Sequence, residues 1–406
     1  MKSKQITDSI YCIRADLYDL PFFEGIWSLP TGVTINSYLV RGQKTALIDL
    51  VEDAADAPAQ FESALSGLGC DFSSIDYLIL NHLEPDHSGY LKEFRVKNPR
   101  AVIVSTEKGI KLIEAFYGIT DNTRAVKSGD SIDLGGKTLV FYETPNIHWP
   151  ETMMTWQPES GTLFSCDGFG SFGALGNSVF DDELTPEQLR AYDAESLRYY
   201  ANIVASFSSF VTSAIKKLDE LKILNALACV APSHGIVYRK NPRGIVEQYA
   251  RYASYAKQGE KEIAVVWGSM YGNTKRGLDA VIKGIEAEGV PYTLCRVPND
   301  HISDILAAAY KSAGIVLAMP TYEYAMFPPM AWTLDMFKRK HINGKTALRI
   351  GSWGWSGGAK REYDALLESL KWTSVEPVEW QGCPTAETES LLEQRGRELA
   401  KAVLAL

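Results

Sequence analysis

The segment over residues 81–89 constrains this chain more than any other. It reads Asn-His-Leu-Glu-Pro-Asp-His-Ser-Gly and places two imidazoles and two carboxylates within six residues. An apolar run over residues 75–80 precedes it and predicts a buried strand. Divalent metals bind deprotonated nitrogen and oxygen donors that a rigid backbone brings together, as a loop leaving a strand end does. The segment therefore predicts a metal site, and its carboxylates favour a metal harder than zinc.

The spacing within this segment predicts the direction of its side chains. His82, Glu84 and Asp86 are two residues apart, so an extended backbone would direct all three to one side. The alternative is a polar surface loop that contains helix-capping residues. Four potential ligands with no bulky residue between them argue against that alternative.

Length, charge and composition define the broad class of protein. A chain of 406 residues exceeds what one hydrophobic core usually serves, so two domains are expected. The net charge of −9 does not favour binding to nucleic acid or to an anionic membrane, because both attract positively charged proteins. The start of the chain lacks an apolar signal segment, no apolar run could span a bilayer, and the six cysteines form no CxxC pair. We therefore expect a cytoplasmic protein with reduced, mostly buried thiols.

The first part of the chain predicts a layered, β-rich domain with interleaved helices. Strands are expected over residues 33–39, 45–50, 77–80, 101–105 and 138–142, and helices over 59–68 and 107–116. Turn signals separate these runs. A long helical pattern then extends from Pro186 to about residue 224, with Thr185 as its expected N-cap.

The second part has a different pattern, in which apolar strands alternate with helices and predict a parallel sheet of βαβ units. Strands are expected over residues 263–267, 292–295, 314–319 and 347–351, and helices over 275–288, 329–339, 359–370 and 387–404. Residues 252–261 are polar and small and mark the expected boundary. The predicted domains are therefore residues 1–255 and 262–406.

A site for two metals needs more ligands than one loop provides, and other strand ends offer them. His148, Asp167 and His234 each follow an apolar run that predicts a strand. A carboxylate such as Asp167 could bridge two metals, whose repulsion at short range requires an anion between them. Each residue alone has an ordinary explanation, as a capping aspartate or a hydrogen-bonded core histidine. Together with residues 81–89 they form an ordered set on successive strand ends.

The loop over residues 268–274 lies between the first strand of the second part and a helix. Ser269 and Thr274 offer hydroxyls, Gly272 permits close approach of the backbone, and a helix N-terminus favours an anion. The loop lacks both the Walker motif and the GxGxxG fingerprint, so it is a weak signal by itself. Its position strengthens it, because ligands of open α/β sheets bind at the carboxyl ends of strands. We expect it to bind a phosphate.

Two further strand ends add aromatic side chains. Residues 319–324 and 352–358 follow predicted strands and combine Tyr322, Trp353 and Trp355 with small polar residues. Such loops can stack on a planar ring and hydrogen-bond to it. The alternative is that these aromatic residues only pack the domain.

The order of the metal-site motifs resembles the metallo-β-lactamase superfamily, whose loop normally reads HxHxDH. Here Glu84 replaces the second histidine, and the added anionic oxygen disfavours zinc and stabilises oxidised iron. The pattern HxExDH, then histidine before Trp-Pro, aspartate in Cys-Asp-Gly and histidine in Ser-His-Gly, is similar to the diiron domain of flavodiiron proteins. Residues 262–406 resemble flavodoxin. The resemblance implies an α/β fold, with an N-terminal metallo-β-lactamase-like αββα sandwich and a C-terminal flavodoxin-like doubly wound parallel sheet.

The resemblance also implies ligands for two irons and for FMN. One iron would be bound by His82, Glu84 and His148 and the other by Asp86, His87 and His234, with Asp167 bridging them. In the family, the histidine at the position of His87 can be turned away from the metal. The FMN phosphate would be held by Ser269, Met270, Tyr271, Gly272, Asn273 and Thr274, and its ring by Pro320, Thr321, Tyr322, Ser352, Trp353, Gly354 and Trp355. No catalytic residue beyond the iron ligands is predicted.

A flavin and a diiron site together can deliver four electrons to dioxygen. The resemblance thus implies reduction of dioxygen to water, of nitric oxide to nitrous oxide, or of both, and ligand spacing does not separate the two gases. Without a CxxC pair no fused rubredoxin module is expected, so a separate rubredoxin or another reduced flavoprotein would donate electrons. In the family each flavin lies far from its own irons, which implies a head-to-tail homodimer.

Two other functions are compatible with parts of the sequence. A dizinc hydrolase with an appended flavodoxin domain would use a metal-bound hydroxide on an ester, lactam or thioester. Glu84 and the flavodoxin-like half argue against it. A non-catalytic electron-transfer scaffold would require a first domain without metal. Tyr200 and the aromatic-rich residues 22–27 are candidates for tuning the choice between the two gases.

Overall fold

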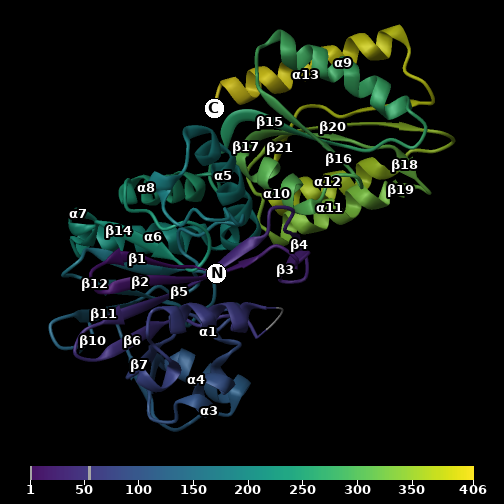
Figure 1. The fold of residues 1–406 in the computed structure, drawn as a ribbon. Coiled ribbons are helices and arrows are strands. Elements are labelled where there is room, and N and C mark those ends of the chain that lie inside the picture. Colours follow the sequence, from purple (N-terminus) through teal and green to yellow (C-terminus); the bar gives the residue numbers. More distant parts are fainter. Residues whose placement is uncertain (1, 54–55) are drawn as a thin grey trace. The chain divides into compact units, whose positions relative to one another are not determined.

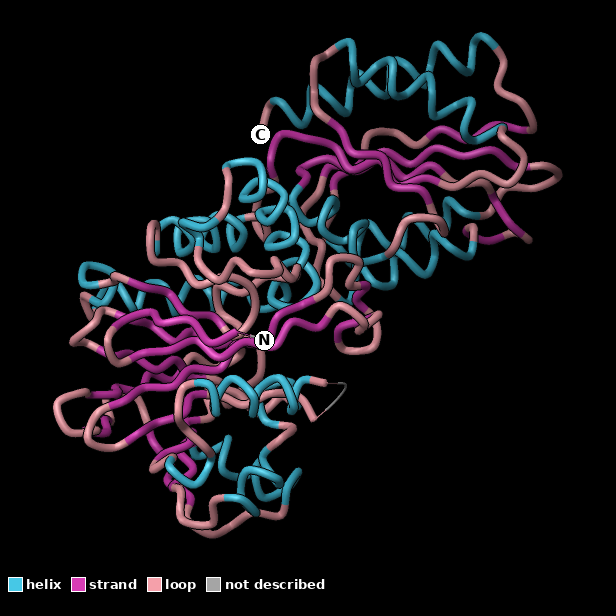
Figure 2. The backbone as a smooth tube through the Cα atoms, viewed as in Figure 1, coloured by secondary structure: helices cyan, strands magenta, loops and turns pink. Residues whose placement is uncertain are grey.

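The computed structural model describes residues 2–53 and 56–406, which form two compact units (Figure 1). The first unit contains the residues up to Tyr200 together with Ser209–Ala250, and the second contains Ala201–Ser208 together with Arg251–Leu406. Both units combine helices with extended strands (Figure 2). No helix in the described ranges joins the length and the apolar character that a bilayer crossing requires.

Two sheets form the core of the first unit. The larger sheet has the order β1-β2-β5-β6-β7-β8-β9, antiparallel from β1 to β6 and parallel from β6 to β9. The smaller sheet has the order β10-β11-β12-β13-β14, in which β13 and β14 run parallel. The strands are β1 (Lys2–Thr7), β2 (Ile10–Leu17), β5 (Val33–Arg41), β6 (Thr45–Ile48), β7 (Tyr77–Ile79), β8 (Val102–Thr106), β9 (Thr123–Val126), β10 (Ser131–Asp133), β11 (Thr138–Glu143), β12 (Met153–Gln157), β13 (Thr162–Cys166) and β14 (Cys229–Pro232), and β3 (Phe22–Phe23) and β4 (Trp27–Ser28) form a separate hairpin.

The two sheets pack face to face, and helices cover them. Val40 and Val104 of the larger sheet and Phe141 and Phe164 of the smaller sheet belong to one buried cluster. Figure 1 shows α1, α3 and α4 on one side of the sheets and α6 and α8 on the other. The helices are α1 (Ala57–Gly67), α2 (Pro85–Ser88), α3 (Leu91–Lys97), α4 (Glu107–Tyr117), α5 (Pro186–Tyr199), α6 (Ser208–Glu220), α7 (Ile223–Ala226) and α8 (Pro242–Ser254). The predicted αββα sandwich is confirmed.

The helical stretch predicted from Pro186 to about residue 224 is not continuous. The predicted N-cap is confirmed, because the Thr185 hydroxyl accepts a hydrogen bond from the Gln188 N–H at 3.2 Å. The first helix ends at Tyr199, and a π-helical turn (Tyr200–Val204) and a 3-10 turn (Ala205–Phe207) precede α6. Such turns still bury one side of the chain, so the apolar spacing in the sequence does not reveal them.

One parallel sheet with helices on both faces forms the second unit. Its order is β16-β15-β17-β20-β21, and β22 also pairs with β20. Figure 1 shows α9 and α13 on one face and α10, α11 and α12 on the other. The elements are β15 (Glu260–Trp267), α9 (Asn273–Ala287), β16 (Tyr292–Arg296), α10 (Ile302–Lys311), β17 (Ser312–Ala318), β18 (Thr321–Tyr322), β19 (Ala325–Met326), α11 (Pro328–Arg339), β20 (Thr346–Trp353), α12 (Ala359–Leu370), β21 (Thr373–Ser374), β22 (Val378–Gln381) and α13 (Ala386–Leu404). This order confirms the predicted flavodoxin-like doubly wound sheet.

The segment over residues 252–261, expected to be a polar boundary, belongs to the second unit and contributes buried side chains to it. Tyr252 and Tyr255 are buried, and α8 extends as far as Ser254. The Tyr310 hydroxyl donates to the Tyr252 carbonyl at 2.9 Å, and the Tyr255 hydroxyl donates to Glu260 Oε1 at 2.7 Å. Tyrosine buries a large ring while its hydroxyl keeps a partner, so a polar composition does not imply a solvated segment.

Candidate metal centre and flavin pocket

The predicted metal ligands gather at the ends of strands in the first unit. His82 follows β7, His148 follows β11, Asp167 follows β13 and His234 follows β14, while Glu84, Asp86 and His87 lie further along the loop after β7. All of them are buried except Glu84, which is partly exposed. The structure therefore brings together all seven residues that the sequence analysis selected.

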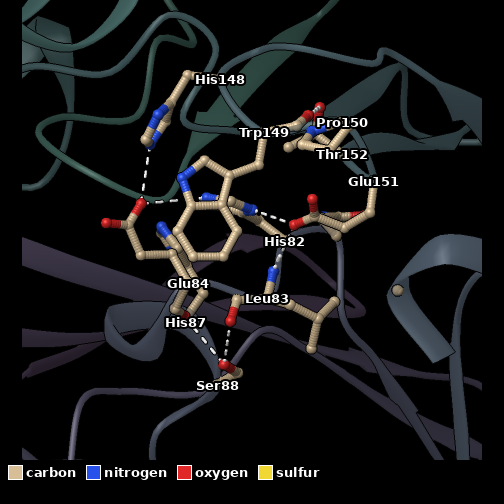
Figure 3. Close-up of polar contacts among 12 residues, drawn as sticks. His82, Leu83, Glu84, His87, Ser88, His148, Trp149, Pro150, Glu151 and Thr152 are labelled. Carbon is tan, nitrogen blue, oxygen red and sulfur yellow. Dashed lines mark hydrogen bonds and ion pairs between the residues drawn. The ribbon is translucent and has the colours of Figure 1, made fainter. Parts of the chain in front are cut away.

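The loop after β7 turns at Pro85 instead of remaining extended. Residues 85–88 form one helical turn, with Glu84 directly before it. The Ser88 hydroxyl closes this turn by donating to the carbonyls of Leu83 and Glu84, at 2.8 and 2.9 Å (Figure 3). The predicted alternation is therefore wrong at Asp86, which lies on the turn and away from the group that His82 and Glu84 form. Proline suits the first position of a helix, and that preference overrides the extended pattern.

Glu84 connects two histidines into the first group of ligands. Its Oε2 lies 2.8 Å from His148 Nε2 and 3.2 Å from His82 Nε2 (Figure 3). The same two nitrogens lie 3.5 and 3.3 Å from Asp167 Oδ2. The donor atoms of these four residues thus converge closely enough to bind one metal ion.

Asp86, His87 and His234 form the second group of ligands. Asp86 Oδ2 lies 3.1 Å from His234 Nε2 and 3.3 Å from His87 Nε2. These nitrogens approach Asp167 Oδ1, at 3.3 Å for His234 and 3.0 Å for His87. Asp167 therefore presents one oxygen to each group, which is the arrangement that a ligand bridging two metals needs.

Several buried polar atoms in the two groups make no hydrogen bond to any residue that the structure describes. They include Oδ1 and Oδ2 of Asp86, Oδ2 of Asp167 and Nε2 of His234. An unsatisfied buried polar group costs about 1–3 kcal/mol, so clustered groups of this kind call for another partner. Cations at the two groups would satisfy them, and a mixed set of imidazole and carboxylate donors suits iron. The residues thus fit a pair of iron ions.

Hydrogen bonds on the far side of two imidazole rings orient them. His234 Nδ1 donates to the Thr34 carbonyl at 2.8 Å, and because a carbonyl can only accept, His234 Nε2 keeps its lone pair when the ring is neutral. His82 Nδ1 pairs in the same way with Glu151 Oε1 at 2.7 Å (Figure 3). Partners of this type fix the ring and raise its basicity toward a metal.

Glu151 is a functional candidate that the sequence analysis missed. Its side chain is buried and also accepts a hydrogen bond from the Leu83 N–H at 3.1 Å. The only signal in the sequence is its position three residues after His148. The folding of the loops decides which carboxylate hydrogen-bonds to the imidazole nitrogen that does not face the metal. Residue spacing alone does not predict this contact.

Carboxylates control the protonation of the metal-free histidines. Burial opposes a charged imidazole, but the hydrogen bonds to Glu151 and Glu84 raise the pKa of His82 well above its usual value. Burial acts in the same way on His234, but the nearby carboxylates of Asp167 and Asp86 nevertheless raise its pKa to about 10. These imidazoles therefore hold protons that a metal must displace.

Aromatic rings enclose the site next to His234. The Phe23 ring lies 5.3 Å from the His234 ring, edge to face, and the Tyr199 ring lies 5.8 Å from it. Of the predicted tuning candidates, the aromatic-rich N-terminal segment thus contributes Phe23. Tyr200 contacts a different tyrosine instead, and its neighbour Tyr199 lies beside the metal ligand. Adjacent helical residues point about 100° apart, so Tyr199 faces the metal ligand while Tyr200, one residue later, does not.

A pocket of about 250 Å³ opens at the carboxyl ends of the strands in the second unit. Every residue predicted to hold FMN lines this pocket, with the exception of Gly272. The pocket is also lined by Glu323 and Gly382, which the sequence analysis missed. Gly272 shapes the loop instead, with a φ of 91° and an N–H that donates to Ser269 Oγ at 3.0 Å. Pocket-lining aromatic and hydroxyl side chains match the needs of a planar ring with a phosphate.

Comparisons with known proteins agree with this architecture. Residues 33–235 match the family described as ODP family beta lactamase. The anaerobic nitric oxide reductase flavorubredoxin of Vibrio vulnificus (strain YJ016) is 33% identical over 401 residues, which cover 98% of this chain and 79% of that protein. The nitric oxide reductase of Moorella thermoacetica is 32% identical over 406 residues, covering 98% of each chain.

Solved structures extend the similarity to the whole fold. The rubredoxin oxygen:oxidoreductase from Desulfovibrio gigas superposes with a TM-score of 0.93 at 26% identity, covering 100% of this chain and 99% of that one. The flavodiiron protein from Giardia intestinalis gives a TM-score of 0.92 at 25% identity, covering 100% and 97%. Fold and site define a class of two-domain flavoproteins with a dinuclear metal centre. This chain belongs to the flavodiiron protein family, which confirms the resemblance.

The contact between Glu151 and His82 predicts a loss of metal affinity in Glu151→Gln. Glutamine keeps the size of the side chain but removes the charge that polarises the ring, so iron should bind about 10–100-fold more weakly. Competition with a chelator measures this affinity. Glu107→Gln, which removes an exposed carboxylate that pairs with Lys111 at 3.0 Å, is the control and should bind iron as the native chain does. Native affinity in Glu151→Gln would contradict this role.

The raised pKa values of His82 and His234 predict that ferrous iron releases protons when it binds. His234, with a pKa of about 10, is protonated at pH 7, and the raised pKa of His82 acts in the same direction, so the metal must displace protons and its affinity should fall as the pH falls. Adding ferrous iron anaerobically to metal-free protein in a pH-stat should consume base. Magnesium, which prefers oxygen ligands, should consume little. Iron binding without proton release would show that the histidines are already neutral.

Proposed function

We propose that this chain reduces dioxygen to water, nitric oxide to nitrous oxide, or both. The observation that carries the proposal is the position of Asp167, whose two oxygens face two separate groups of metal ligands. Relatives named nitric oxide reductase and rubredoxin oxygen:oxidoreductase support it. As a flavodiiron protein the chain is an oxidoreductase with FMN and a non-haem diiron centre as its cofactors.

We assign the iron ligands from the two groups of side chains. His82, Glu84 and His148 would hold one iron, Asp86, His87 and His234 the other, and Asp167 would bridge them. His87 is included because its Nε2 points at the same oxygens as His234 Nε2 does. Iron ions held by these residues would supply the redox chemistry that reduction of either gas requires. The Asp167 carboxylate would keep its negative charge between these cations, since the imidazoles around it outweigh burial and hold its pKa well below its usual value.

The chain's own residues control access and protons around this centre. Phe23 and Tyr199 present apolar ring surface beside His234, which suits a small apolar gas better than an ion. Burial, with the nearby charge of Asp167, raises the pKa of the Tyr199 hydroxyl well above its usual value. This buried hydroxyl has no hydrogen-bond partner within residues 2–53 and 56–406, so it is available as a donor near the metal ligands.

We assign FMN to the pocket of the second unit. The loop over residues 269–274 would hold its phosphate, and residues 320–322 and 352–355 would hold its ring. The hydrogen bond between Thr274 Oγ1 and Ser352 Oγ, at 2.9 Å, joins the phosphate loop to one ring loop and supports a single binding site. The functional domains would accordingly be residues 1–255 and 262–406.

The remaining assignments concern partners and compartment. A separate rubredoxin or another reduced flavoprotein would donate electrons, and the chain would act as a head-to-tail homodimer in the cytoplasm, without membrane or nucleic acid. Its cysteines, which are free and buried except for Cys383, suit a reducing compartment. Full activity at dilutions where the protein is monomeric would contradict the homodimer.

An anaerobic assay of the FMN- and iron-loaded protein tests the function. Under one reductant, the protein should consume dioxygen, nitric oxide or both, and the ratio of the two turnover rates should define its preference. A sample loaded with zinc in place of iron keeps the ligand geometry but lacks redox chemistry, so it should consume neither gas. If the iron-loaded protein consumes neither gas, the proposed function is wrong. A Glu84→His variant with two irons and native turnover would show that Glu84 does not select iron.

A further inference from the structure

Arg349 is a buried charge in the second unit with little compensation. Its side chain has no exposed surface, and Nη1 lies 2.6 Å from Oε1 of Glu379, a side chain that is 23% exposed. The contact lacks hydrogen-bond geometry, and among the described residues none of the three guanidinium nitrogens makes a hydrogen bond. Removing a charged group from water is costly unless it is well paired. Hydrophobic packing alone does not explain an arginine at this position.

The Arg349–Glu379 pair lies on the two strands that lead into the flavin pocket. β20 continues from Arg349 to Trp353, which lines the pocket. β22 contains Glu379 and ends shortly before Gly382, which also lines it. The two strands pair in parallel, with Gly351 opposite Glu379. Neither member of the pair lines the pocket, but both lie on strands that lead to residues which do.

Glu379 borders one of the two ring loops. A Cβ atom placed on Gly357, in the loop after β20, would lie 3.8 Å from Glu379 Oε2 and 4.0 Å from Cδ1 of Trp353. The carboxylate and the indole thus meet around the same glycine. A negative charge at this distance from a ring-binding side chain acts on whatever occupies the pocket.

Arg349 borders the other ring loop. A Cβ atom on Gly351 would lie 1.9 Å from the Met319 carbonyl oxygen and 3.2 Å from Arg349 Nη2. Met319 directly precedes Pro320, which lines the pocket. Because residue 351 is a glycine, the Met319 carbonyl can lie close to β20. The Arg349 guanidinium is therefore next to the start of the first ring loop, and the Glu379 carboxylate is next to the second.

We propose that the Arg349–Glu379 pair sets the reduction potential of the bound flavin, with Arg349 raising it and Glu379 lowering it. This inference rests on the assignment of FMN to the pocket. Reduction adds electron density to the ring, which a nearby cation stabilises and a nearby anion opposes. Arg349 has no exposed surface and Glu379 is 23% exposed, so water screens the two charges only in part. Arg349 and Glu379 are thus positioning residues for electron transfer and not catalytic ones.

Two single variants with opposite expected signs test the proposal. Glu379→Gln removes a negative charge and should raise the potential, whereas Arg349→Met removes a positive charge and should lower it. Each shift should reach about a tenfold change in the ratio of oxidised to reduced flavin, or ~30 mV for two electrons. The double variant should return toward the native potential. Redox titration of the flavin absorbance in the holoenzyme measures all of them.

Glu262→Gln is the matched control for the charge change. Glu262 Oε2 pairs with Lys311 Nζ at 2.8 Å near the amino ends of β15 and β17, at the opposite edge of the same sheet from the pocket. This variant loses the same charge and should keep the native potential. An equal shift in Glu262→Gln would overturn the proposal, because the effect would then not depend on position.

The outcomes separate this inference from the proposed function. Native protein that binds no FMN would overturn the FMN assignment and the inference together. FMN-loaded variants that titrate at the native potential would overturn the inference alone, as would shifts of the same sign in Glu379→Gln and Arg349→Met, since a loosened pocket explains those. If Arg349→Met does not fold, Glu379→Gln decides: a raised potential supports the proposal, and an unchanged or lowered one overturns it.

Discussion

The candidate metal centre depends on one carboxylate held between two groups that each contain two histidines and one further carboxylate. Asp167 is 1% exposed and lies within 3.5 Å of four imidazole nitrogens. Burial by itself would neutralise this carboxyl, and the imidazoles keep it charged. Because each oxygen faces a different group, this one side chain would set both the separation and the charge balance of two cations bound there. Glu84 and Asp86 then complete one group each.

The features that could be predicted from the sequence are those that depend on the spacing of residues close together in the chain. Residues 81–89 showed a metal site because ligands on a strand-end loop stay close in space whatever the rest of the chain does. His148, Asp167 and His234 could be added because each follows an apolar strand, and neighbouring strand ends meet at one edge. The same logic selected the lining of the flavin pocket. The spacing of apolar residues, every 2 residues in strands and every 3.6 in helices, predicted the fold class of both halves.

The features that spacing did not reveal depend on tertiary contacts or on a single turn. Pro85 starts a helical turn that redirects Asp86, and the sequence offers an extended reading of equal quality. The choice between Tyr199 and Tyr200 is a rotation about a helix whose exact phase depends on packing. Glu151 and Arg349 matter through partners that lie far from them along the chain or on another strand. Such residues become visible only when the loops and strands are placed.

The hydrogen bond from His234 to the Thr34 carbonyl has a consequence for how the first unit is assembled. Thr34 belongs to β5 of the larger sheet, whereas His234 follows β14 of the smaller one. His82 and Asp167 likewise extend from different sheets. Neither sheet can present the complete ligand set by itself, so metal affinity and sheet docking are thermodynamically linked. Ions bound by this ligand set would stabilise only the state in which both sheets are docked, and iron content would then report how much of the protein has docked them correctly.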